Sequence, residues 1–84
     1  MITPTLCRAA RVLLGWKQDD LANRSEVGVA AIRRFEGGKT TPHRTTLKAL
    51  QTTFEDAGIA FLTHDGEPVG LQFRVGRGAG PDQS

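Results

Sequence analysis

The stretch "GWKQDDLANRSEVGVAAIRRFEGGK", residues 15–39, holds two short segments in which apolar residues recur at helical spacing. The segments are separated by "SEVG" at residues 25–28, and Gly37-Gly38 ends the second one. This pattern predicts one helix over about residues 17–24 and another over about residues 29–36. Helices this short are marginal in water on their own, so we expect the pair to pack against other elements.

Segments on both sides of this pair predict two further helices. Before it, apolar residues lie at the spacing of one helix face, at Leu6, Ala9, Ala10, Leu13 and Leu14. Thr3 or Thr5 is suited to cap the start of that helix, and Gly15 suits its end. After the pair, Thr41-Pro42 opens a helix that runs until Gly58, with apolar residues at Leu47, Leu50, Phe54 and Ala57. Residues 1–58 are therefore predicted to form a compact, mainly α domain of four short helices.

The periodicity changes after Gly58. The stretches "IAFLTH" and "VGLQFRV" carry β-branched and aromatic residues, and "DGEP" between them is typical of a turn. They indicate a hairpin, or two strands that pair elsewhere. Because a two-stranded ribbon is marginal alone, its apolar face needs a cover, either the fourth helix or a second copy of the chain. We expect a β arm over residues 59–75, which is a candidate dimerisation element, and a disordered tail over residues 76–84.

Charge is spread unevenly over this 84-residue chain, whose formal net charge is +2. Residues 1–48 hold nine Lys or Arg against four Asp or Glu, a formal charge of +5. Residues 49–84 hold two basic residues against five acidic ones, a formal charge of −3. This asymmetry favours a polyanionic partner at one end of the molecule, although a merely solvated surface is an equal alternative.

Several function classes find no support in the sequence. No apolar run approaches the roughly 18 residues that a membrane span needs, and Arg8 and Arg11 interrupt the N-terminal apolar stretch, so we expect a cytoplasmic protein rather than a secreted one. Cys7 is the only cysteine, and His43 and His64 lie far apart without acidic clusters, so neither a metal nor another cofactor is expected. No nucleophile–base pattern indicates an enzyme.

A helical wheel of residues 29–36 separates two faces. Ile32 and Phe35 point toward the core, while Val29, Ala30, Arg33 and Arg34 form the opposite face. In the major groove of DNA, arginine reads guanine and small apolar groups contact the thymine methyl. An alternative remains open from the wheel alone, in which the two arginines are a solvated patch on an ordinary helical bundle.

The spacing of several residues gives a more specific indication. With "RVLLGWKQDDLA" at residues 11–22, "VGVAAIRRFEGGK" at 27–39, Pro42 and "TL" at 46–47, the chain resembles the Cro/cI-type (XRE-family) helix-turn-helix transcriptional regulators over roughly residues 5–58. The resemblance implies a lambda-repressor-like domain of four or five helices that binds double-stranded DNA sequence-specifically, with residues 29–36 in the major groove. It also implies a homodimer on a palindromic operator.

The resemblance assigns roles to individual residues. Gln18 matches a residue that touches phosphate and braces the recognition helix, and Arg11 and Glu36 match a pair that ties the first helix to the end of the third. The full set of DNA-contacting residues that it implies is Lys17, Gln18, Val29, Ala30, Arg33, Arg34, Lys39, Thr40 and Arg44.

This chain departs from the family pattern at three points. Glu26 stands where the turn usually has glycine, and a left-handed backbone there would cost about 1 kcal/mol. Gly28 and Lys17 stand where hydroxyl caps are common. Val29 and Ala30 offer no hydrogen-bonding side chain, so readout is expected to rest on the arginines, on methyl contacts and on DNA shape.

A second function remains open. An antitoxin or adaptor-type interaction protein could use its C-terminal strands to bind a partner protein by adding a strand to a sheet. Loss of a foreign partner on deletion of residues 59–84, with self-association intact, would favour this alternative over the regulator.

Overall fold

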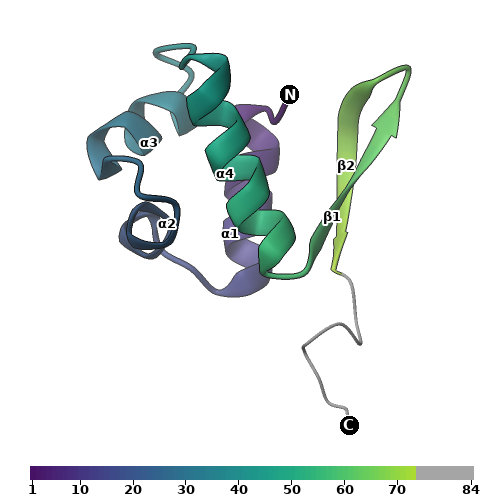
Figure 1. Cartoon of the computed structure of the whole chain (residues 1–84), viewed down its shortest axis with the longest axis horizontal. Coiled ribbons are helices and arrows are strands. Elements are labelled where there is room, and N and C mark those ends of the chain that lie inside the picture. The colour runs from purple at the N-terminus through teal and green to yellow at the C-terminus, as the bar shows by residue number, and fades with distance from the viewer. Residues whose placement is uncertain (74–84) are drawn as a thin grey trace, which may run out of the picture.

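A computed structural model describes residues 1–73, and its mainly helical architecture with a C-terminal hairpin confirms the predicted fold class (Figure 1). Predictions for Arg74, Val75 and residues 76–84 lie outside the described residues. The elements, in chain order, are α1 (Pro4–Leu14), α2 (Gln18–Ser25), α3 (Val29–Glu36), α4 (Arg44–Asp56), β1 (Ile59–His64) and β2 (Glu67–Phe73).

Local signals in the sequence define both ends of α1. The Thr3 hydroxyl accepts a hydrogen bond from the backbone N–H of Leu6 at 3.2 Å, which satisfies one of the free donors of the first turn. At the other end Gly15 adopts a left-handed conformation with φ of 71°, which glycine adopts without a steric penalty. The backbone N–H of Trp16 then donates to the Arg11 carbonyl at 2.9 Å and closes the last turn.

The turn between α2 and α3 contains the strained residue that the family resemblance implies. Glu26 has a left-handed backbone with φ of 63° and ψ of 24°. Ser25 offsets part of that cost, because its hydroxyl donates to the Leu21 carbonyl at 2.7 Å and accepts from the Val27 N–H at 3.2 Å. The turn is therefore fixed by a side chain beside Glu26 rather than by glycine.

The predicted start of the fourth helix is wrong by about two residues. The helix begins at Arg44, after His43, whose backbone is extended with ψ of 155°. Thr41 precedes a proline, and the proline ring disfavours helical geometry in the residue before it. As a consequence the segment before Arg44 is a loop that leaves α3 and returns to the core.

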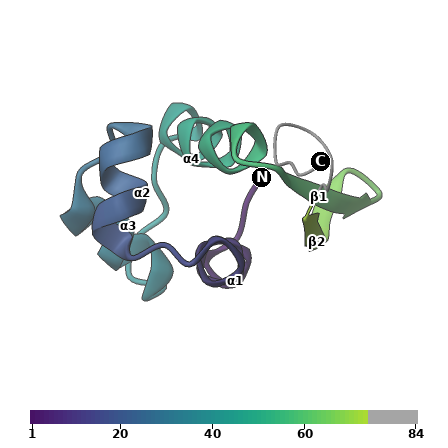
Figure 2. The same cartoon turned by 90° about the horizontal axis from the view of Figure 1, so that it is seen from below.

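The core lies between α1 and α4, with α2 and α3 at one end of the molecule and the hairpin at the other (Figure 2). In the described part of the chain it consists of ten buried apolar residues: Ile2, Cys7, Ala10, Leu21, Ile32, Phe35, Leu47, Leu50, Phe54 and Ile59. Trp16 is half-buried and packs against this cluster, with its ring stacked on Phe54 at a centroid distance of 5.8 Å. The aromatic stack joins the α1–α2 connection to α4.

One residue of the predicted inner face of α1 lies elsewhere. Leu13 is 49% exposed, because the buried face of α1 runs through Cys7 and Ala10 and turns Leu13 toward solvent. The prediction of Leu13 as a core residue is therefore wrong. Val12, its neighbour, is 74% exposed.

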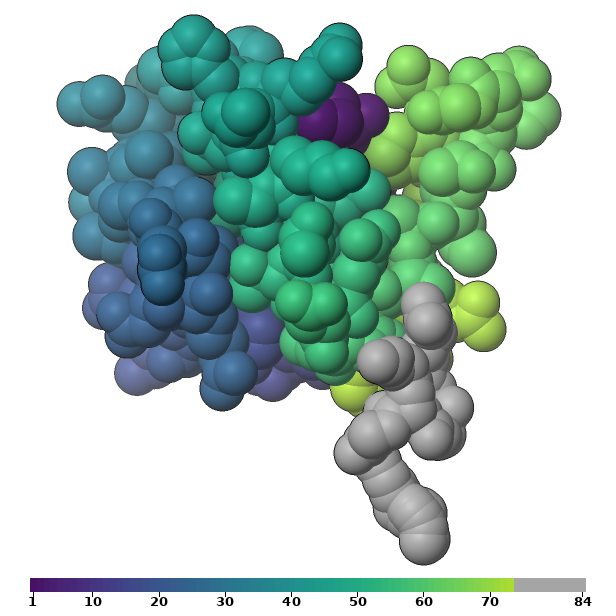
Figure 3. All heavy atoms as spheres, in the orientation of Figure 1, coloured from purple at the N-terminus to yellow at the C-terminus, as the bar shows by residue number. Residues whose placement is uncertain are grey.

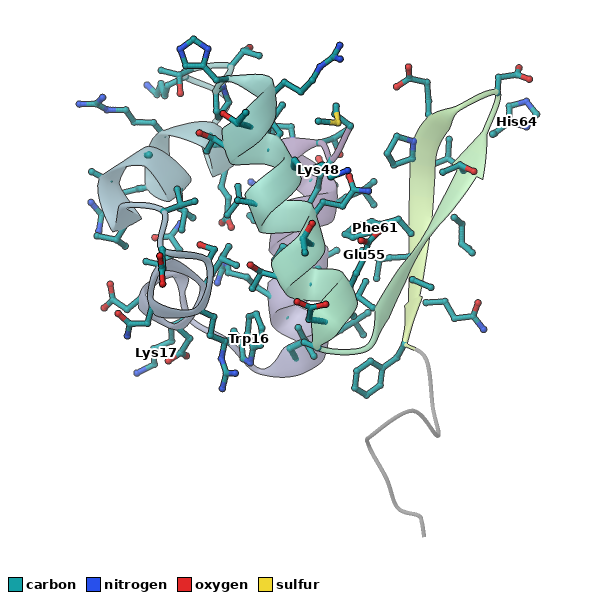
Figure 4. All side chains as sticks on the ribbon, viewed as in Figure 1. Trp16, Lys17, Lys48, Glu55, Phe61 and His64 are labelled. Atoms are coloured by element: carbon teal, nitrogen blue, oxygen red, sulfur yellow. The ribbon has the colours of Figure 1, made fainter. Side chains whose placement is uncertain are left out.

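The two strands pair with each other in an antiparallel hairpin, which decides between the two predicted arrangements. Ile59 pairs with Phe73 and Phe61 with Leu71, and a register shift at Leu62/Thr63 interrupts the ladder. Phe61 points from β1 toward α4 (Figure 4) and meets the Phe54 ring edge-on at 6.3 Å. The fourth helix thus covers β1, as one of the two predicted alternatives requires, while β2 contacts α1.

Among residues 1–73, no helix combines the length and apolar character needed to cross a bilayer.

Candidate nucleic-acid interface

The outward face of α3 consists of two arginines and two alanines. Ile32 and Phe35 are buried, whereas Arg33, Arg34 and Ala30 are exposed. Ala30 and Arg34 are four residues apart, so they lie above one another on the same side of the helix. This part of the predicted outer face is exposed to solvent.

Two residues of α3 differ from the predicted faces. Val29 is half-buried, and Ala31, which the wheel left out, is exposed. The buried set of α3 includes Glu36 as well as Ile32 and Phe35. Because Glu36 lies on the same side as Val29, the buried face is turned toward Val29 and away from Ala31. A helical wheel that considers only apolar residues does not show that Glu36 is buried.

A buried ion pair holds the carboxyl end of α3 against α1. The Arg11 guanidinium contacts Glu36 with both ends of its fork, at 2.7 Å from Nε to Oε2 and 2.6 Å from Nη2 to Oε1. The side chains are 15% and 2% exposed, respectively. Arg11 also donates from Nη1 to the Trp16 carbonyl at 3.1 Å. The predicted tie between the first and third helices is confirmed.

Glu36 collects further donors from two other elements. Gln18 Nε2 lies 3.2 Å from Glu36 Oε1, and the Cys7 thiol lies 3.2 Å from Oε2. Arg8 donates to the Glu36 backbone carbonyl at 3.1 Å. Each charge-assisted hydrogen bond contributes more than a neutral one. Side chains from α1 and α2 therefore fix the orientation of α3.

The protonation states of this cluster follow from its geometry. Burial alone raises the pKa of Glu36, but hydrogen bonds from Arg11, Cys7 and Gln18 outweigh it and hold that pKa below its ordinary value. Burial, followed by the hydrogen bond to the carboxylate, raises the pKa of the Cys7 thiol well above its ordinary value. Glu36 is thus ionised and Cys7 is a protonated donor at neutral pH.

The network uses a side chain that the resemblance assigns to DNA. The Gln18 amide is half-buried and bonded to Glu36, so it braces the recognition helix as the resemblance implies. Its second implied role, contact with phosphate, would use the other N–H of the same amide nitrogen, because the amide oxygen is an acceptor.

The remaining basic residues flank α3 on two sides. Lys39, Thr40 and Arg44 are exposed in the loop and at the first residue of α4. The Lys39 N–H donates to the Arg34 carbonyl at 2.9 Å, which brings the loop to the end of α3. Lys17 is exposed just before α2, and Figure 4 shows it beside that helix, away from the loop.

The two flanks of α3 differ in charge. A hollow beside Val29 is lined by the acidic residues Asp19 and Glu26 together with Asn23. The loop at the other end of α3 carries Lys39, followed by Arg44. A polyanion is therefore attracted more strongly to the loop side of α3 than to the turn between α2 and α3.

Residues 1–73 contain no group of three or more His, Cys, Asp and Glu side chains placed to hold a metal ion.

Two short helices joined by a tight turn are the motif of helix-turn-helix DNA-binding proteins. In this chain the second helix is held on one face by the Glu36 network and exposes arginines on the other. The helix-turn-helix family model matches residues 8–55, which is more than half of the chain. The chain belongs to this family, as a Cro/cI-type regulator. No curated protein matches the sequence.

Proposed function

We propose that this DNA-binding regulator binds double-stranded DNA sequence-specifically, with α3 in the major groove. The observation that carries the proposal is the pairing of two faces on one short helix. One face is fixed by the Glu36 network, and the other presents Arg33 and Arg34 to solvent. A helix held rigidly by its inner face loses little conformational entropy when its outer face meets the bases.

Base readout is proposed to combine guanidinium and methyl chemistry. Arginine donates a bidentate pair of hydrogen bonds to guanine O6 and N7, and small apolar side chains contact the thymine methyl. Arg34 and Arg33 supply the first kind of group, and Ala30, Ala31 and the exposed part of Val29 supply the second. We therefore expect bound sites to contain guanine next to thymine in each half-site.

Phosphate contacts are proposed for the residues around α3. They come from Lys39, Thr40 and Arg44 on the loop side and from Lys17 and Gln18 at the start of α2. Such contacts set the position of the protein on the duplex and make binding depend steeply on salt. If a dimer neutralises roughly six to ten phosphates, the slope of log K against log salt is about −5 to −9.

A homodimer on a palindromic operator is proposed, because one α3 reads only one half-site. The β arm, residues 59–75, is the proposed contact. Within residues 1–73, β2 pairs with β1 alone, so its other edge offers backbone groups that a twin could pair. Exposed apolar side chains on this arm, Leu62, Val69 and Phe73, are available for the same contact.

Selection of bound sequences from a random duplex pool tests this function. We expect a two-fold symmetric site, and about 1–3 kcal/mol weaker binding to it by Arg34→Ala, with relaxed preference at one base position. Arg24→Ala, which removes the same charge, serves as the matched control. The Arg24 guanidinium lies 4.7 Å from the centroid of the Trp16 ring, near the end of α4 that is opposite Arg44. Equal losses of DNA affinity in the two variants would show that Arg34 acts only through its net charge, which would contradict base readout.

Replacement of thymine by uracil in the selected site tests the methyl contacts alone. Each methyl that α3 covers is worth about 0.8 kcal/mol, or roughly a fourfold change in affinity. Uracil at positions outside the half-sites is the control. Unchanged affinity at every thymine would leave the arginines as the sole readers.

The same exposed strand edge also favours a second candidate, an antitoxin or adaptor that adds its hairpin to the sheet of a partner protein. Deletion of residues 59–84 separates the two functions. Loss of self-association and operator binding together supports the regulator, whereas loss of a foreign partner with self-association intact supports the adaptor.

A further inference from the structure

Helix α1 carries a second apolar stripe on its outer side. Thr5, Ala9, Val12 and Leu13 lie at i, i+4, i+7 and i+8, the spacing of a helix face that packs on another element. Val12 is 74% and Leu13 is 49% exposed. Both charged residues of α1 are bonded to Glu36, Arg8 to its backbone carbonyl and Arg11 to its carboxylate. Apolar residues on two sides of a helix are typical of a helix that other elements cover on both sides.

The outer stripe forms one wall of an apolar groove. The α1–β2 groove is lined by Thr5, Arg8, Ala9, Arg11, Val12 and Leu13 from α1 and by Leu71 from β2. Figures 2 and 3 show the hairpin at the edge of the molecule beside the helical part. The second wall is thus the strand whose outer edge is unpaired within residues 1–73.

We infer that the α1–β2 groove is the contact surface between two copies of this chain, so that α1 as well as the hairpin forms the dimer. This inference rests on the proposed function, which requires two copies on one operator. It names a surface that the β arm alone does not include. Two-fold symmetry needs a self-complementary patch, and this one combines a projecting side chain, Val12, with an apolar hollow.

The chemistry of the groove favours a second copy over the chain's own C-terminal segment. Residues 74–84 contain a single large apolar side chain, Val75, for a groove with several apolar positions. A second copy supplies a whole apolar stripe from its own α1, which includes Ala9, Val12 and Leu13.

The helix dipole favours an antiparallel arrangement of the two α1 helices. With the two-fold axis beside Val12, the remaining N–H groups of Arg8, which also bonds the Glu36 carbonyl of its own copy, lie near the carboxyl end of the other α1. The last carbonyls of a helix carry a partial negative charge that attracts a cation. Ala9 is small and lets the two helices approach closely, and the free β2 edges extend the contact.

The oligomeric state of Val12→Glu tests the inference without DNA. Because Val12 is largely exposed, the variant is expected to fold, which its thermal melting checks. Two-fold symmetry places two new carboxylates in the apolar contact, and we expect the dimer dissociation constant to rise at least about tenfold. Thr52→Glu on the exposed side of α4 is the matched control and leaves the dimer unchanged. A Val12→Glu dimer as tight as the wild type would overturn the inference.

Cross-linking tests the proposed axis directly. Val12→Cys is expected to form a disulfide-linked dimer under mild oxidation, and Thr52→Cys is not. Native Cys7 is fully buried and does not compete. A wild-type chain that stays monomeric at concentrations well above operator saturation would refute the inference, as would a foreign protein that protects Val12→Cys from modification.

Failure of this surface and failure of DNA binding have different signatures. Binding of Val12→Glu to a single half-site is expected to equal that of the wild type, while binding to the full operator weakens. If Arg34→Ala has no effect on the half-site, the proposed function fails, whatever the oligomeric state.

Discussion

The helical part of the molecule, residues 4–56, and the hairpin, residues 59–73, meet their surroundings in different ways. Of the ten buried apolar residues, Ile59 is the one that the hairpin contributes among the described residues. Of the six exposed large hydrophobic residues within residues 1–73, the hairpin contributes Leu62, Val69 and Phe73, and α1 contributes Val12 and Leu13. The helical part buries most of its apolar groups between its helices, whereas exposed apolar side chains collect along α1 and the hairpin.

This difference separates two tasks within a small chain. The recognition helix is oriented by a buried polar network that leaves its outer face free to bind. The other end of the molecule presents apolar side chains and a strand edge, features that single small domains do not normally leave uncovered. The surface proposed to bind DNA and the hairpin proposed to take part in self-association thus lie at opposite ends of the molecule.

The contrast between the two parts requires that the Glu36 network stabilises the helical part. Arg11→Ala leaves the Glu36 carboxylate buried without its ionic partner, and we expect a loss of about 3–5 kcal/mol in the free energy of unfolding. For a domain of this size such a loss approaches the whole stability. Urea unfolding followed by circular dichroism measures it.

The double variant Arg11→Met/Glu36→Leu is the control for this prediction. Removal of both charges leaves no buried ion unpaired, so most of the lost stability is expected to return. DNA affinity should not return with it, because the new side chains no longer fix α3. A loss below about 1 kcal/mol for Arg11→Ala would show that the pair is peripheral.

Within the hairpin, two substitutions sharpen the contrast between docked and exposed side chains. Ile59 is fully buried, so Ile59→Ala is expected to cost about 2–5 kcal/mol of stability. Leu62, three residues later, is 47% exposed, and Leu62→Ala is expected to stay within about 0.5 kcal/mol. Equal effects in denaturant unfolding would mean that the hairpin packs differently.

The smallest expected effect is the pH dependence of the network. Because the folded pKa of Glu36 lies below its unfolded value, its ionisation adds stability that is fully present above the unfolded pKa of about 4.3. That stability is lost as the pH falls through the folded pKa. The difference in unfolding free energy between wild type and Glu36→Gln should therefore shrink in this acid range. A constant difference from neutral to acidic pH would contradict the assignment.

Much of the helical part could be predicted from local sequence. The bounds of α3 and the capping by Thr3 and Gly15 follow from short-range rules that need no tertiary information. The strained backbone of Glu26 was expected from the family resemblance. The Arg11–Glu36 pair came from the resemblance, since no local rule connects residues 25 positions apart.

Other features could not be predicted from the sequence. Leu13 fits two stripes of α1 equally well, and only the packing of Cys7 and Ala10 decides which stripe is inside. The burial of Glu36 likewise turns Val29 inward and Ala31 outward. A hydrophobicity pattern does not show that a polar residue such as Glu36 will be buried.

By itself, the sequence determined which segments are helices and strands, where the tight turns fall, and which family the chain resembles, because these depend on residues only a few positions apart. Only the tertiary structure decided that Cys7 and Gln18 join Glu36, that Phe61 docks on α4, and that α1 and β2 together form an apolar groove. These contacts join distant residues, and their choice depends on which faces exclude water when all the elements pack at once.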